Sequence, residues 1–167
     1  MTRADVKNKL KFGLVEQQAF AAVKDLLSNA ATLYTPDPSK AYILHTDASD
    51  VAVGASLSQY GDDGVTLRPI AFVSQKLNPT QRRWSTVERE SYAVLFALKR
   101  LDHILFGSQL ELQLFTDHSP LAYLMNSQPK SAKLTRWALS LSRYNLVVKH
   151  VNGKDNATAD CLSRAFD

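Results

Sequence analysis

The sequence of 167 residues predicts a mixed α/β domain in which a five-stranded sheet is flanked by helices. Three runs with strand character follow one another at 42–46, 51–59 and 67–74, which indicates an antiparallel meander. Helical stripes then alternate with two further strand-like runs at 110–116 and 145–151. Because 45% of the side chains are hydrophobic, a chain of this length can bury one substantial core.

We expect a helical lead-in at 1–40 that is separate from the domain at 41–167. Apolar residues recur with helical spacing through 16–30, and the two prolines of TPDPSK at 35–40 then break the chain. The second and third strands are joined by YGDDG at 60–64, whose two glycines are typical of a hairpin loop.

The helix after the third strand has a well-defined predicted start. Ser85 is followed three residues later by Glu88, which is the spacing of a capping box. Glu90 lies on the apolar stripe of this helix, one turn before Val94. We therefore expect Glu88 to cap the helix and Glu90 to point inward, toward whatever the helix packs against.

The second half of the chain predicts three more helices. A short helix follows HSP at 118–120, and the loop NSQPKSA at 126–132 leads into a longer helix with an apolar stripe at 134–144. The last strand ends at NGKDN, and the final helix is predicted to begin near its cap, Asn156.

Charge and cysteine content narrow the class of protein. The net charge is +4, but basic residues gather in two blocks, 68–100 and 118–154, and the second contains no acid. Such blocks suit a phosphate-rich partner, although basic helix faces are often only solvated surface. The single cysteine, Cys161, excludes an intramolecular disulfide and a cysteine-rich zinc site. Because no apolar run approaches the ~18 residues of a membrane span, we expect a soluble intracellular protein.

Four acidic residues form the candidate site. Asp47 ends the first strand and Asp117 ends the fourth, and each is preceded by a threonine. Asp160 follows Asn156 by four residues. If the first and fourth strands are parallel neighbours, Asp47 and Asp117 emerge side by side, where the inward Glu90 can join them. Converging buried carboxylates repel each other unless a cation or a proton holds them together, and all-oxygen ligands favour Mg²⁺ or Mn²⁺.

Each acid taken alone has an ordinary explanation. An Asp after a strand is commonly a turn or helix-cap residue, and Asp160 could simply favour the positive end of its helix. The conjunction of two matched strand ends, an inward Glu and a fourth acid favours a metal site. Two ions about 4 Å apart are the arrangement that supports phosphodiester cleavage.

Several long stretches resemble the ribonuclease H domain of reverse transcriptases from LTR retrotransposons of the Ty3/gypsy group. They are ILHTDAS, RPIAFVSQKLNPTQRRWSTVERESYAVLFALKRLDHILFG, LFTDHSPL and VNGKDNATADCLSR. The lead-in is similar to the segment that connects the polymerase to ribonuclease H in such Pol polyproteins. The resemblance implies the ribonuclease H fold, with sheet order 3-2-1-4-5, and a metal-binding set made of Asp47, Glu90, Asp117 and Asp160.

The implied activity is hydrolysis of the RNA strand of RNA/DNA hybrids with two Mg²⁺, for which Mn²⁺ can substitute. The implied partners are the hybrid and the polymerase portion of the same polyprotein, with no membrane and no disulfide-linked partner. The implied location is a cytoplasmic virus-like particle or the nucleus.

Two features depart from the family pattern. The loop before Asp160 is short, so His150 ends a strand instead of assisting product release, and no room remains for a basic protruding helix. Hybrid binding is then expected either from the polymerase portion or from a set of polar and basic residues of this chain: Ser49, Arg82, Arg83, Thr86, His118, Lys130 and Lys133. A noncatalytic ribonuclease H-like module, as in a domesticated element, is the alternative. Another nuclease or strand transferase of the same superfold is disfavoured by the ADCLSR and VERE motifs.

Overall fold

The computed structural model describes residues 13–14, 17–18, 32–108, 110–117 and 132–165. By its internal contacts the chain divides into two units, Met1–Thr32 and Leu33–Asp167. Three predicted segments fall wholly or largely outside the described residues: the helix at 16–30, the short helix after 118–120, and the loop at 126–132.

The second unit is built on a mixed five-stranded sheet in the order β3-β2-β1-β4-β5. The strands are β1 (Tyr42–Ala48), β2 (Ala52–Tyr60), β3 (Leu67–Lys76), β4 (Leu112–Thr116) and β5 (Leu146–His150). β1, β2 and β3 form the antiparallel meander, whereas β1 pairs with β4, and β4 with β5, in parallel. The predicted fold class and strand order are confirmed.

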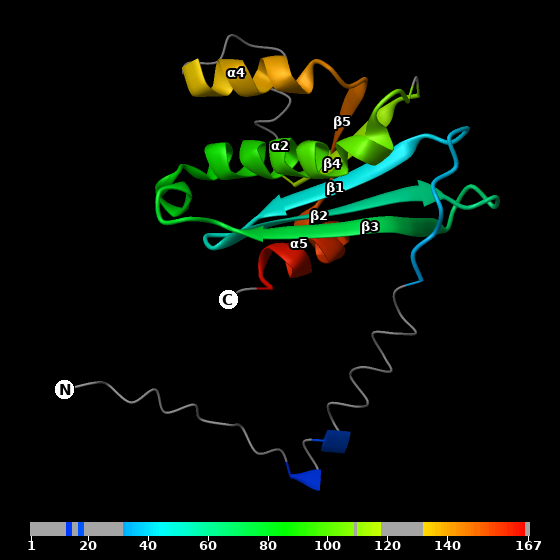
Figure 1. Cartoon of the computed structure of the whole chain (residues 1–167), viewed down its shortest axis with the longest axis horizontal. Helices are drawn as coiled ribbons and strands as arrows, with labels where there is room; N and C mark the ends of the chain where they lie inside the picture. Colours follow the sequence, from blue (N-terminus) through cyan, green and yellow to red (C-terminus); the bar gives the residue numbers. More distant parts are fainter. Residues whose placement is uncertain (1–12, 15–16, 19–31, 109, 118–131, 166–167) are drawn as a thin grey trace. The chain divides into compact units, whose positions relative to one another are not determined.

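Helices cover the sheet on both sides (Figure 1). α2 (Thr86–Leu105) and α4 (Ala132–Leu141) lie on one side, and α5 (Ala157–Ser163) lies on the other. Two short 3₁₀ helices, η1 (Gln81–Arg83) and η2 (Gly153–Asn156), precede α2 and α5. Among the described residues, none of the helices combines the length and apolar character needed to cross a lipid bilayer.

The main core lies between the sheet and α2. Leu44 of β1 and its parallel neighbour Leu114 of β4 are fully buried there, against Val94 and Leu98 of α2. β1 is the central strand, and Ile43 on its other face is also buried, at 1% exposure. Burial on both faces of this strand explains the continuous apolar run Tyr42–Leu44.

The segment that enters β1 is tied to the edge of the sheet. Tyr34 donates its backbone N–H to the Pro69 carbonyl over 2.8 Å. The Gln59 side chain accepts from the Asp37 N–H and donates to the carbonyls of Asp37 and Lys40. These bonds attach residues 34–40 to β2 and β3. The domain boundary expected at residue 40 stays a prediction.

Candidate metal centre

Parallel pairing of β1 and β4 brings two acids to one end of the sheet. His45 pairs with Phe115 in the register of these strands, and Asp47 and Asp117 each lie two residues further on. Because both strands run in the same direction, the two aspartates emerge together, as expected from the sequence.

The third acid is delivered by the start of α2. The Ser85 hydroxyl accepts from the Glu88 N–H at 3.3 Å, and Glu88 Oε2 accepts from the Ser85 N–H at 3.0 Å, which completes the predicted capping box. This cap sets the rotation of the first turn, so Glu90 faces the sheet and is only 4% exposed. The different orientations predicted for Glu88 and Glu90 are confirmed.

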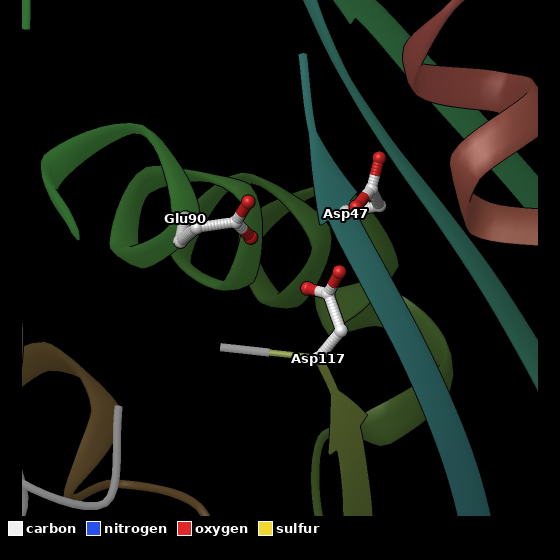
Figure 2. Close-up of side chains that lie close together, drawn as sticks. All are labelled: Asp47, Glu90 and Asp117. Carbon is white, nitrogen blue, oxygen red and sulfur yellow. The ribbon is translucent and has the colours of Figure 1, made fainter. Parts of the chain in front are cut away.

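The three carboxylates converge. One oxygen each from Asp47, Glu90 and Asp117 lies within 4.8 Å of the other two. Figure 2 shows Glu90 reaching from α2 toward the ends of β1 and β4, where the two aspartates lie. Asp47 is 6% exposed, whereas Asp117 is exposed, so the cluster is buried on one side and open to solvent on the other.

The surroundings oppose negative charge at this cluster. Burial, followed by the charges of Asp47 and Asp117, raises the pKa of Glu90 to about 8. Burial also raises the pKa of Asp47, and the hydrogen bond from Ser163 only partly offsets this effect. Glu90 Oε2 is buried and has no hydrogen-bond partner among the described residues. An uncompensated buried carboxylate oxygen beside two further carboxylates fits a hard divalent cation such as Mg²⁺ or Mn²⁺.

Asp160 lies near this cluster but outside it. Its Oδ1 accepts a 2.7 Å hydrogen bond from Arg164 Nε one turn later in α5. The charge of Asp160 nevertheless contributes to the raised pKa of Asp47. Its predicted role as the fourth metal ligand stays a prediction.

Sequence reasoning missed the residues that hold α5 beneath Asp47. Ser163 is fully buried and its hydroxyl donates to Asp47 Oδ2. A Cβ on Gly54 of β2 would lie 2.6 Å from the Ser163 nitrogen, so only glycine permits this close approach. Asn156 occupies the predicted cap position, but its side chain makes no capping bond and instead donates to the Thr46 carbonyl at 3.0 Å. A glycine in mid-strand was the available signal.

The predicted substrate-binding residues fall into two groups by position. Arg82, Arg83 and Thr86 are exposed at the end of α2 that carries Glu90. The hydroxyl of Ser49 instead stabilises the β1–β2 turn and donates to the Ser163 carbonyl at 2.7 Å. The substrate contacts of these four residues stay predictions.

Lys133 is engaged with its neighbours. Its ammonium lies 3.0 Å from Glu88 Oε1 and 3.3 Å from the centroid of the Trp84 ring, and Trp137 is also close. His150 ends β5 as expected, with Nε2 at 3.1 Å from the Asp117 carbonyl oxygen. The other two predicted contacts, His118 and Lys130, lie outside the described residues.

A sheet in the order 3-2-1-4-5, with carboxylates at the ends of its central parallel pair, defines a protein of the ribonuclease H-like class. A family model described as the RNase H-like domain found in reverse transcriptase matches residues 37–144. The chain belongs to this family.

Curated relatives are retrotransposon polyproteins. The chain is 40% identical over 147 residues to the retrovirus-related Pol polyprotein from transposon 297 of Drosophila melanogaster, and 36% identical over 159 residues to that from transposon gypsy. These matches include 88% and 95% of this chain but only 13% and 15% of the polyproteins. The chain therefore spans about one seventh of the length of these Ty3/gypsy-type relatives.

Solved structures share the fold at low sequence identity. The foamy viral protease-reverse transcriptase in complex with double-stranded DNA has a TM-score of 0.61 and 14% identity, over 86% of this chain and 30% of that one. LC11-RNase H1 in complex with an RNA/DNA hybrid has a TM-score of 0.54 and 20% identity, over 72% of this chain and 92% of that one.

Proposed function

We propose that this domain hydrolyses the RNA strand of RNA/DNA hybrids with Mg²⁺, as the ribonuclease H part of a retrotransposon reverse transcriptase. The convergence of Asp47, Glu90 and Asp117 within 4.8 Å carries the proposal. Membership of the RNase H-like family and the likeness to LC11-RNase H1, a protein solved with an RNA/DNA hybrid, support it.

The carboxylates of Asp47, Glu90 and Asp117 would hold the metal ions. When bound, such ions supply Lewis-acid activation of water and stabilisation of the leaving oxygen in phosphodiester hydrolysis. Ser163 restrains the Asp47 carboxylate by a hydrogen bond from the α5 side, which leaves its other oxygen for the cluster. Asp160 is the candidate fourth ligand, and its carboxylate would have to exchange its contact with Arg164 for the site.

The exposed rim of the cluster suits a nucleic-acid backbone. Arg82 and Arg83 are exposed at the end of α2 where the carboxylates lie, and their charge would attract phosphates. RNA would be distinguished from DNA by its 2′-hydroxyls. Because the relatives are polyproteins, the polymerase portion of the same polyprotein is the proposed partner, inside a virus-like particle or in the nucleus.

The test is a cleavage assay on three labelled substrates: an RNA/DNA hybrid, a DNA duplex and an RNA duplex, each in Mg²⁺ or Mn²⁺. We expect cleavage of the RNA strand of the hybrid alone, and its loss in Asp47→Asn and Glu90→Gln. Glu111→Gln is the matched control, because it makes the same carboxylate-to-amide change at an exposed residue. Ca²⁺ is expected to bind without supporting cleavage.

Two results would reject the proposal. One is an intact hybrid in both metals, which would favour the noncatalytic nucleic-acid-binding module if the hybrid still binds. The other is equal cleavage by Asp47→Asn and the unaltered protein.

A further inference from the structure

A cavity of about 220 Å³ opens on the face of the sheet that carries α5. β1, β2 and β3 line its floor, and η2 and the start of α5 line one side. His45 belongs to this lining and lies two residues before Asp47 on the same face of β1. The cavity is therefore about 7 Å along the strand from the metal centre.

Three buried polar side chains line the cavity. Ser56 and Ser58 are only 4% and 6% exposed, and within the described part of the chain neither hydroxyl has a hydrogen-bond partner. Asn156 is 2% exposed, and its Oδ1 likewise lacks a partner among described residues. The Ser56 and Ser58 oxygens are not among the buried atoms that lack a partner, so both hydroxyls are accessible from the cavity, whereas Ala55 and Leu57 on the other face of β2 are apolar. The serines are thus placed to bond to something that enters the cavity.

Aromatic and imidazole rings lie beside Ser56 in the sheet. The cross-strand register places Phe72, Ser56, His45, Phe115 and Lys149 in one row from β3 to β5. The His45 ring stacks on Phe115 with centroids 4.9 Å apart and planes inclined by 16°. Phe72, at the other side of Ser56, is 38% exposed. The row therefore combines exposed ring surface with the Ser56 hydroxyl, which lines the cavity.

The end of this row is basic. The ammonium of Lys149 lies 5.6 Å from the Phe115 centroid and donates to Gln113 Oε1, a neutral partner, at 3.0 Å. Its positive charge is therefore available to an anion. Asp155 also lines the cavity, so the cavity itself does not favour an anionic group.

We infer that this cavity binds one unpaired nucleobase of a single-stranded nucleic acid, whose backbone passes Lys149. A base offers a flat ring for Phe72 and His45 and edge donors and acceptors for Ser56 and Ser58. An aliphatic ligand would leave both hydroxyls unsatisfied, and a free phosphate would meet Asp155. The inference goes beyond the proposed function, because hydrolysis of a hybrid requires no site for an unpaired base.

The experiment uses the full chain in EDTA, so that its result does not depend on the metal centre. Ten-nucleotide single strands of DNA and RNA that contain one 2-aminopurine are titrated with protein, and the quenching of 2-aminopurine fluorescence reports stacking. We expect saturable quenching. Phe72→Leu should weaken binding about tenfold, the size typical of one lost stacking contact. Phe106→Leu is the matched control, since Phe106 is 74% exposed and lies outside the cavity.

A second measurement does not depend on any variant folding. Amide NMR signals of Ser56 and Ser58 in the unaltered protein should shift on addition of the single strand, whereas that of Phe106 should not. Absence of quenching, equal effects of Phe72→Leu and Phe106→Leu, or unshifted serine signals would overturn the inference. If the polymerase portion protects this face and single strands do not bind, the inference is overturned and the face is a protein interface.

Discussion

Gly54→Ala tests whether the close approach of α5 to the sheet supports the metal centre. A Cβ at this position would lie 2.6 Å from Leu162 Cβ, 2.6 Å from the Ser163 nitrogen and 2.7 Å from the Ala159 carbonyl oxygen. Two of these three atoms belong to the backbone of α5, so rotation of a side chain cannot relieve the clash. The helix must retreat from 2.6 Å to about 3.4 Å, a shift of about 0.8 Å.

This shift has two costs. Overpacking of a tight contact typically costs about 1–3 kcal/mol. The hydrogen bond from Ser163 to the Asp47 carboxylate is stretched as well, and a bond to a charged group contributes about 1.5–3 kcal/mol. Alanine recovers about 0.5–1 kcal/mol of backbone entropy. We expect a net loss of about 2–4 kcal/mol in the free energy of unfolding, together with weaker Mg²⁺ binding.

Urea unfolding, with and without Mg²⁺, measures both effects. Gly61→Ala is the matched control, because its Cβ would meet only the flexible tips of Arg68 and Asp63, at 3.0 and 3.1 Å. The reasoning is refuted if Gly54→Ala unfolds within ~0.5 kcal/mol of the unaltered protein, the scatter of neutral substitutions. Equal destabilisation by the two alanine variants would also refute it.

Three further predictions concern the carboxylates and the cap. Because the fold raises the pKa of Glu90 from 4.5 to about 8, its protonated form is favoured, and stability without metal should fall as pH rises from 4.5 through 8. Melting temperatures in EDTA would show this slope, which Glu90→Gln should flatten; an unchanged slope would contradict the assignment. Added Mg²⁺ should raise the melting temperature at pH 8 in the unaltered protein and much less in Asp117→Asn, and an equal rise in both would exclude Asp117 from the site. Ser85→Ala removes the capping hydroxyl and should cost about 1 kcal/mol in urea unfolding, whereas a neutral result would show that the cap is dispensable.

Local patterns were sufficient to predict the strands and helices of the described residues and the convergence of three acids. The capping box at Ser85 sets the phase of α2, so the inward direction of Glu90 follows from counting residues along a helix. The prediction that Asp47 and Asp117 lie side by side required one assumption, that β1 and β4 are parallel neighbours. The register of the two strands confirms this assumption. Hydrophobic periodicity does not predict the order of strands in the sheet, because strand pairing joins residues that are far apart in the chain. The strand order was predicted from the resemblance to a known family.

The sequence by itself determined the type and order of the described strands and helices, the convergence of Asp47, Glu90 and Asp117, and which family the chain resembles. These features depend on local spacing and on long ordered motifs. Tertiary structure alone decided that Ser163 bonds to Asp47 and that Asn156 ties η2 to β1. It also placed Ser56 beside His45, in a cavity on the face of the sheet that carries α5. Such contacts join segments that only the packed sheet brings together, so spacing along the chain carries no signal for them.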